Sequence, residues 1–317
     1  MPSSSSPPPA RARTITVKGQ RLRVAIRPGA GTRSPLLLMN GIGANLELLQ
    51  PFVDALDGAI EVIRFDVPGV GGSPAPAIPY RFMTLAWLIA RMLDQLGYNQ
   101  VDVLGISWGG ALAQQFAVQH RTRCRRLILV STAPGALMVP GRPAVLAKLA
   151  TPRRYLDPAY LARIAPELYG GDLRAHSEEV RAYARAVQAG SAWGYLYQML
   201  ATVCWTSLPW LPLIRQPTLI LSGDDDPIVP PVNAQIMRRL IPDARLRVFN
   251  GGHLGLLTQA RELAPIVTQF LAEKPPPDRK ARRSRSSSVP DRLWQIVRLM
   301  QRNLEQLLIR LQQRRTR

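Results

Sequence analysis

Residues 103–112 read VLGISWGGAL, and this stretch decides the fold class. The apolar run VDVLG at 101–105 is typical of a buried strand, and WGGALAQQFAVQ at 108–119 has the periodicity of a helix. The turn between them has the pattern G-x-S-x-G, which lifts Ser107 out of the sheet with its hydroxyl exposed. Side chains at the two glycines would clash with the neighbouring strand or helix. The alternative, a turn of small residues without chemistry, is disfavoured by the strand and helix on its two sides.

Apolar runs alternate with helical segments along most of the chain. Continuous apolar runs are expected when both faces of a parallel sheet are covered, so the sequence predicts one doubly wound α/β domain with a mostly parallel sheet. Two short alternating runs, Thr14–Lys18 and Leu22–Arg27, predict a β-hairpin at its start. Further strands are predicted at residues 35–40, 59–66, 101–105, 126–131, 217–223 and 245–250, and helices at 45–56, 82–96, 108–119 and 232–240.

The alternation fails between Pro134 and Pro212. This segment is too long for a loop between two core strands, so residues 134–212 are expected to form a helical cap over the strand ends. Within it, helices are predicted at 145–149, 177–188 and 195–203. The remaining divisions are a disordered lead (1–13), the α/β core (14–133 and 213–273), a basic Pro/Ser/Arg linker (274–290) and a basic amphipathic helix (291–317).

Charge is distributed unevenly along the chain. The 317 residues carry a formal net charge of +20, and residues 274–317 supply half of it with 13 basic and 3 acidic side chains. Such a tail is either solvated or bound to an anionic partner such as lipid, nucleic acid or an acidic protein. Two cysteines without metal-binding spacing predict free thiols, and the N-terminus lacks the apolar region of a secretory signal. Because no apolar stretch reaches the ~20 residues that span a bilayer, we expect a soluble, cytoplasmic protein.

A serine nucleophile needs a base, and the chain has three histidines. His120 ends the helix after the turn and is expected to be solvated, while His176 lies in the cap and is expected at the surface. His253 follows the last predicted strand, where a Gly-Gly loop returns the chain to the carboxyl edge of the sheet, on the side of Ser107. We therefore predict that His253 is the base.

A histidine base in turn needs a carboxylate that fixes its tautomer and stabilises the imidazolium. The loop after the strand at 217–223 offers three in a row, Asp224, Asp225 and Asp226. Asp226 is favoured because Pro227 fixes the chain direction just after it, which leaves the other two to cap or solvate the loop. An acidic turn with no role is the alternative. The order Ser, Asp, His along the chain is that of α/β-hydrolases.

Acyl transfer also needs hydrogen-bond donors for the oxyanion. The amide of Trp108 faces the space beside Ser107 from a helix N-terminus, where partial positive charge favours an anion. The second donor is predicted at the amide of Ile42 in the loop of LLLMNGIGAN. Many hydrolases of this fold have a histidine where this chain has Asn40, a change that leaves a backbone donor intact. Asp66 and the glycines of DVPGVGGS are expected to form a structural turn beside the site.

Seven segments extend the pattern well beyond the serine turn. NGIGANLELLQPF, FDVPGVGGS, GISWGGALAQQFA, TPRRY and YGG in the cap, QPTLILSGDDDPIVP and GGHLGL occur in this order between about Thr14 and Phe270. Together they resemble the intracellular poly(3-hydroxyalkanoate) depolymerases of the medium-chain type. The resemblance implies an α/β-hydrolase fold and a triad of Ser107, Asp226 and His253, with no metal or other cofactor. It also implies cleavage of ester bonds in a cytoplasmic, granule-borne polyester through an acyl-enzyme, releasing 3-hydroxy acids or oligomers.

Aromatic residues of the cap are expected either to line an apolar slot for the alkyl side chains of the polymer or to be plain core. The predicted substrate contacts are Asn40, Trp193, Tyr195, Tyr197 and Trp205. Two other functions stay open, because one fold hosts many activities. The first is a carboxylesterase, thioesterase or carbon–carbon bond hydrolase that uses the same triad on small substrates. The second is a non-enzymatic granule-associated protein, which the intact triad residues disfavour.

The C-terminal segment carries an apolar seam with steps of 4, 3, 4, 3 and 4 residues. Such a helix packs on the body of the protein, self-associates, or lies on the granule surface with its arginines toward anionic phospholipid or an acidic granule protein. No base-reading motif accompanies the charge, so a specific nucleic-acid partner is not predicted. The seam consists of Leu293, Val297, Met300, Leu304, Leu307 and Leu311.

Overall fold

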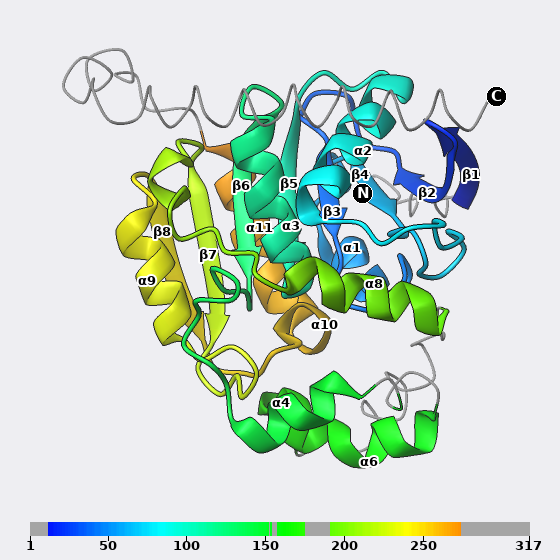
Figure 1. Cartoon of the computed structure of the whole chain (residues 1–317). Coiled ribbons are helices and arrows are strands. Elements are labelled where there is room, and N and C mark those ends of the chain that lie inside the picture. Colours follow the sequence, from blue (N-terminus) through cyan, green and yellow to red (C-terminus); the bar gives the residue numbers. More distant parts are fainter. Residues whose placement is uncertain (1–11, 152, 154–156, 175–190, 274–317) are drawn as a thin grey trace, which may run out of the picture. The chain divides into compact units, whose positions relative to one another are not determined.

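The computed structural model of the chain describes residues 12–151, 153, 157–174 and 191–273. Strands within them are Ala12–Val17 (β1), Gln20–Arg27 (β2), Leu36–Met39 (β3), Val62–Phe65 (β4), Val101–Ile106 (β5), Cys124–Val130 (β6), Thr218–Gly223 (β7) and Ala244–Phe249 (β8). They form one sheet in the order β1-β2-β4-β3-β5-β6-β7-β8 (Figure 1). The predicted hairpin is confirmed, since β1 pairs antiparallel with β2. β2 also pairs antiparallel with β4, and the remaining neighbours are parallel.

The central strands explain why the sequence reads as continuous apolar runs. Every residue of β3, β4, β5 and β7 is buried. At the edge strand β8, by contrast, only the first and last residues are buried, and the residues between them are half-buried or exposed. β1 begins inside the segment predicted as a disordered lead, since Ala12 and Arg13 pair with Ala25 and Val24.

Helices cover both faces of the sheet, as Figure 1 shows. Phe82–Gln95 (α2) and Trp108–Gln119 (α3) lie on one face. Gln50–Ala55 (α1) and Ala260–Ala272 (α11) lie on the other, where Phe52, Val267 and Phe270 join β-strand side chains such as Leu36 and Leu104 in one core cluster. Val232–Leu240 (α9) and the short Gly255–Thr258 (α10) complete this part of the chain.

The helix predicted at 45–56 is wrong in its first turn, because α1 begins only at Gln50. The amide of Leu46 donates to the carboxylate of Asp66 at 2.7 Å, and the amides of Leu48 and Gln50 donate to carbonyls only three residues earlier, as in turns. Pro51 stands in the first turn of α1, where its missing N–H costs nothing. Residues 45–49 therefore form turns that belong to the loop after β3.

A helical segment separates β6 from β7, as predicted for the cap. It comprises Pro143–Ala150 (α4), Pro158–Tyr169 (α6), Gly171–Arg174 (η1), Ala192–Thr202 (α8) and Leu211–Leu213 (η2). α8 crosses near the carboxyl ends of the strands, and α4 and α6 lie beyond it (Figure 1). The helix predicted at 177–188, the linker 274–290 and the basic helix 291–317 lie outside the described residues. The cap boundaries at 134 and 212 stay predictions.

The strand order fixes where functional loops meet. The chain runs from β3 outward to β4 and then returns to β5 on the other side of β3, so the sheet has a topological switch point between β3 and β5. In open α/β sheets this is where crevices for ligands open, at the carboxyl ends of the strands. The loop after β3 and the G-x-S-x-G turn after β5 both lie there. No helix among the described residues combines the length and the hydropathy that a membrane span requires.

Candidate active site

Ser107 stands at the turn from β5 into α3 with backbone angles of φ 54° and ψ −121°. A residue with a side chain adopts this region at a cost of about 1–3 kcal/mol, so the surrounding packing must hold it. A Cβ on Gly105 would lie 2.7 Å from the Cβ of Ala113, and one on Gly109 would lie 2.6 Å from the carbonyl carbon of Met39. The predicted need for both glycines is confirmed, and the strained turn presents the hydroxyl at the switch point.

His253 lies in the loop between β8 and α10 and is buried. Its Nε2 lies 2.8 Å from the Oγ of Ser107, across 146 residues of sequence. This distance suits transfer of a proton from a serine hydroxyl to a neutral imidazole. The structure therefore brings together the nucleophile and the base that the sequence predicted.

Asp226 follows β7, and its Oδ2 lies 2.8 Å from the Nδ1 of His253. Its other oxygen, Oδ1, accepts hydrogen bonds of 2.9 Å from the amides of Ile228 and Val229. The carboxylate is fully buried, so these two amides and the imidazole fix its orientation. The oriented carboxylate in turn holds the imidazole of His253 with its Nε2 directed at Ser107, as a general base requires.

The two neighbouring carboxylates have other partners, as predicted. Asp224 accepts a hydrogen bond from the amide of Gly251 at 2.9 Å and so braces the start of the His253 loop. Asp225 accepts from the amide of Gly171 at 2.8 Å and pairs with Arg174 at 2.7 Å. Both therefore connect the loop after β7 to segments around the site rather than to the histidine.

The loop after β3 lies against the serine turn. A Cβ on Gly41 would lie 3.6 Å from the Cβ of Ser107. The predicted donor Ile42 directly follows Gly41, so its amide belongs to the loop segment that lies against the nucleophile. Trp108 is the first residue of α3, so its amide has no acceptor within that helix. Asn40 is buried, and its Nδ2 donates to the carbonyl of Asn45 at 2.7 Å across the loop. The amides of Ile42 and Trp108 stay our predicted oxyanion donors.

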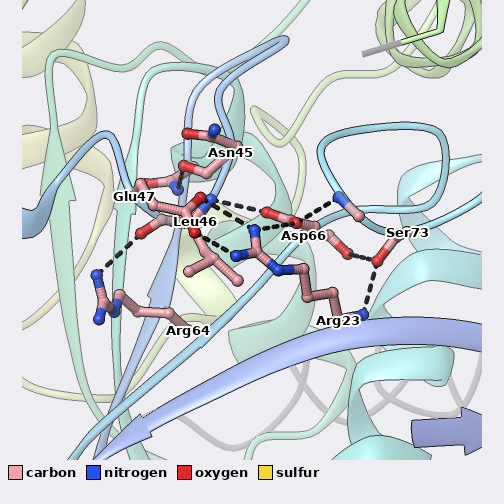
Figure 2. A network of polar contacts seen from close by, with 9 residues as sticks. Arg23, Asn45, Leu46, Glu47, Arg64, Asp66 and Ser73 are labelled. Carbon is pink, nitrogen blue, oxygen red and sulfur yellow. Dashed lines mark hydrogen bonds and ion pairs between the residues drawn. The ribbon is translucent and has the colours of Figure 1, made fainter. Parts of the chain in front are cut away.

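A buried polar network supports this loop, as Figure 2 shows. The Asp66 carboxylate accepts hydrogen bonds from the amides of Leu46 at 2.7 Å and Gly72 at 2.8 Å, and it pairs with Arg23 at 3.3 Å. Arg64 donates to the carbonyl of Leu46 at 2.9 Å. Burial raises the pKa of Asp66, and its hydrogen bonds and Arg23 oppose that rise. Asp66 thus has the structural role predicted for it.

Two cap residues that sequence reasoning missed contact the site. The carbonyl of Tyr169, at the end of α6, accepts a hydrogen bond from the amide of His253 at 2.8 Å. Gln198 of α8 accepts a hydrogen bond from the amide of Gly43 at 2.8 Å through its Oε1. The YGG segment that begins at Tyr169 carries part of the family resemblance but does not indicate its partner, and no local pattern distinguishes Gln198 from a surface residue.

The predicted aromatic contacts of the cap lie in different environments. Tyr195 is buried and donates its hydroxyl to the carbonyl of Leu149 at 2.6 Å, a contact within the cap. Trp205 donates through Nε1 to Gln115 at 2.9 Å and packs on Phe82. Trp193, by contrast, is 64% exposed. Tyr197 lies between the rings of Trp193 and Tyr80. Their contact with substrate stays a prediction.

The expectation that His120 is solvated is wrong. Its ring packs on Phe116, with 5.2 Å between the ring centroids, and burial together with Arg123 and Arg91 lowers its pKa to about 4. The residue ends α3, far along the helix from Ser107, and it takes no part in the site. His176 lies outside the described residues.

Comparisons with known proteins agree with this architecture. A model of the alpha/beta hydrolase fold family matches residues 34–260, and the chain belongs to this family. Over 268 residues it is 52% identical to a poly(3-hydroxyalkanoate) depolymerase from Ectopseudomonas oleovorans, which covers 84% of this chain and 95% of that protein. The predicted fold and the predicted resemblance are both confirmed, and the chain is a hydrolase.

More distant relatives share the same architecture. A 3-oxoadipate enol-lactonase 2 from Acinetobacter baylyi is 27% identical over 247 residues, which cover 78% of this chain and 91% of that protein. Among solved structures, the enol-lactonase from Burkholderia xenovorans LB400 matches with a TM-score of 0.71 and 26% identity. That match covers 82% of this chain and 100% of the other.

Proposed function

We propose that the chain hydrolyses ester bonds of an intracellular poly(3-hydroxyalkanoate), with Ser107 as nucleophile, His253 as general base and acid, and Asp226 as the carboxylate that orients the histidine. The observation that carries the proposal is the continuous line of contacts from Asp226 through His253 to Ser107, with 2.8 Å at each step. The 52% identity to a protein named for this polymer supports the substrate class.

The proposed reaction starts with attack of the Ser107 hydroxyl on an ester carbonyl while Nε2 of His253 takes the hydroxyl proton. The tetrahedral oxyanion is held by the amides of Ile42 and Trp108, where a preorganised donor contributes more than it does in water. As the ester C–O bond breaks, His253 gives its proton to the leaving alkoxide oxygen, which becomes a hydroxyl end of the polymer chain, and an acyl-enzyme on Ser107 remains. Water, activated by the same histidine, releases the acyl group as a 3-hydroxy acid or oligomer.

An exposed apolar face on α8 favours a polymer over a small soluble substrate. Trp193, Leu196 and Leu200 are all exposed, and their spacing places them on one side of the helix, while the exposed Val203 directly follows its last residue. The buried side of the same helix carries Gln198, which contacts the loop beside Ser107. A water-insoluble polyester offers apolar surface to such a face, whereas a small ester needs none.

The intracellular location is supported by the cysteines of the chain. Cys124 and Cys204 are both free, and unpaired thiols suit a reducing compartment. We propose that the basic segment 291–317 contacts a granule-associated protein or anionic phospholipid at the polyester granule. Removal of residues 274–317, which leaves α11 whole, followed by co-sedimentation with granules tests this, and undiminished binding would contradict it.

Purified protein and its Ser107→Ala variant, incubated with native medium-chain polyester granules and with p-nitrophenyl butyrate, test the function. We expect the wild type to release 3-hydroxy acids from granules and the variant to lose activity on both substrates. Undiminished hydrolysis by Ser107→Ala would overturn the triad. The enol-lactonase relatives favour a second candidate, hydrolysis of a small ester or lactone. Activity on the soluble ester without release from granules would select that candidate.

A further inference from the structure

Gln198 joins two segments of the site that are far apart in sequence. It lies on α8 and is fully buried. Its side-chain Oε1 accepts a hydrogen bond from the amide of Gly43 at 2.8 Å. Its main-chain carbonyl accepts one from the indole Nε1 of Trp108 at 2.9 Å. One cap residue therefore contacts both the loop after β3 and the first residue after Ser107.

These two segments carry the proposed oxyanion donors. Gly43 directly follows Ile42, so a hydrogen bond at its amide restrains the peptide that begins at Ile42. The ring of Trp108 belongs to the residue whose amide is the other donor. Because the position of a donor relative to the developing charge decides its effect, a residue that restrains both segments controls the geometry of the oxyanion hole.

Packing alone does not explain a glutamine at this position. Its Nε2 is buried and has no hydrogen-bond partner among the described residues, and an orphaned amide of this kind costs about 1–3 kcal/mol. Methionine has a similar shape and would avoid that cost. The benefit of glutamine therefore lies in its oxygen and in what that oxygen holds, the amide of Gly43.

The position of α8 is fixed at both ends, so Gln198 acts from a rigid support. Near the first turn, Gly194 approaches the backbone of Gly69 so closely that a Cβ on it would lie 2.6 Å from the Cα of Gly69. Near the last turn, Arg81 donates to the carbonyls of Leu200 at 3.0 Å and Val203 at 3.1 Å. These contacts tie the helix to the loops after β4.

We propose that Gln198 is a positioning residue that sets the oxyanion hole through the Gly43 amide and the Trp108 ring. The inference rests on the proposed function, because it assigns Gln198 a task in that same reaction. Gln198 touches the loop and not the reacting atoms, so its effect is expected on the transition state more than on binding of the substrate.

The test is Gln198→Met, which keeps the shape and removes the acceptor for Gly43. We expect kcat on p-nitrophenyl butyrate to fall about 10- to 100-fold, less than for outright loss of a donor, with KM changed by no more than about threefold. The affinity of a trifluoromethyl ketone inhibitor, whose adduct with serine mimics the oxyanion, is expected to weaken by the same factor as kcat/KM. Leu240→Met on α9, an exposed position outside the site and outside the apolar face of α8, is the matched control and is expected to match the wild type.

Trp108→Phe provides a second variant, because it keeps a ring and removes the Nε1 donor to Gln198. It is expected to show a smaller loss of the same kind, which tests the contact at the main-chain carbonyl. If Gln198→Met does not fold, Gln198→Leu, which also lacks the acceptor for Gly43, decides the question. A kcat within twofold of the wild type in folded Gln198→Met, or a loss that appears only in KM, would overturn the inference. The Ser107→Ala variant separates the two failures. If it is inactive, the proposed function stands and only the role of Gln198 is overturned. If it is active, the proposed function itself is overturned.

Discussion

The main-chain carbonyl of Tyr169 accepts a hydrogen bond from the amide of His253 at 2.8 Å. The two rings are also nearly parallel, with 15° between their planes and 6.3 Å between their centroids. Tyr169 ends α6 in the cap, whereas His253 belongs to the loop after the last strand of the sheet. The cap therefore holds the proposed base as well as the loop beside the nucleophile, and its removal would disturb both.

Gly252→Ala tests this contact between cap and base. A Cβ on Gly252 would overlap the carbonyl oxygen of Tyr169 and lie 2.6 Å from the carbonyl carbon of Gly170. The loop must shift to relieve the overlap, and displacement of a catalytic group by 1 Å lowers rates by up to about 100-fold. We expect kcat to fall at least tenfold. Steady-state kinetics beside Gly58→Ala, where a Cβ would meet nothing within 4 Å, check this. Equal kcat in the two variants would contradict the expectation.

Asp226→Asn removes the carboxylate that orients His253 and is expected to lower kcat by roughly 10⁴-fold. The neighbouring change Asp225→Asn is the control, because Asp225 lies one residue away and pairs with Arg174 at the surface. An asparagine at that position still accepts the hydrogen bond of Gly171. The prediction is measured as initial rates on p-nitrophenyl butyrate. If the two variants lost similar activity, the assignment of the acid would be wrong.

The network of Figure 2 predicts a large loss of stability for Asp66→Ala. The substitution leaves the amides of Leu46 and Gly72 and the guanidinium of Arg23 without the carboxylate. Removal of one partner from a buried charge network costs about 3–5 kcal/mol. Glu47→Ala removes the other, half-exposed partner of Arg23 and is expected to cost less than about 1 kcal/mol. Urea unfolding at pH 7 measures both, and a similar loss in the two would refute the prediction.

The buried ring of His120 is expected to lower the free energy of unfolding in acid. Its pKa is about 4 in the folded chain because of burial, against about 6.5 when unfolded. Between pH 6.5 and 4 the imidazole is therefore protonated in the unfolded state and neutral in the folded state. The stability present above pH 6.5 is lost as the pH falls toward 4. The slope is about 1.4 kcal/mol per pH unit, or about 3 kcal/mol in all.

Urea unfolding of the wild type and His120→Gln between pH 7.5 and 4.5 isolates this contribution, because other titrating groups are common to both. The free energy of unfolding of the wild type is expected to fall more steeply than that of the variant. Parallel curves would show that His120 does not titrate as its buried ring requires.

Trp193→Ala tests the exposed face of α8. We expect release of 3-hydroxy acids from granules to fall several-fold, because the indole is 64% exposed and supplies the largest apolar area of that face. Hydrolysis of p-nitrophenyl butyrate is expected to stay unchanged, since the ring contacts Tyr197 and not the triad. Val248→Ala, an exposed apolar residue on β8, is the control. Equal loss on both substrates would contradict a role at the polymer surface.

The core of the site could be predicted from the sequence because strand ends are visible there. Ser107, Asp226 and His253 each follow a predicted strand, and parallel strands bring their carboxyl ends to one edge of the sheet. Loop chemistry also favoured Asp226 over its two neighbours. These inferences needed only the order of strands and the residue types at their ends.

The remaining errors and omissions come from contacts between distant segments. The helix expected from residue 45 begins late because residues 45–49 form turns, and the Asp66 carboxylate, 20 residues from Leu46, accepts the Leu46 amide within them. His120 is half-buried because its ring folds back on Phe116. Gln198 acts through Gly43, 155 residues earlier in the chain. Local periodicity carries no record of such partners, so only the folded chain reveals them.

The bare crossing of Gly194 over Gly69 has a consequence for engineering. Because no side chain separates the two segments, main-chain dimensions set the position of the N-terminal end of α8 at this crossing. Libraries that randomise the exposed positions Leu196 and Leu200 can therefore change the binding surface of α8 while the Gly194–Gly69 contact stays the same. A side chain at either glycine would instead push α8 away from the loop that contains Gly69. A library built on such a variant would carry this displacement in every member.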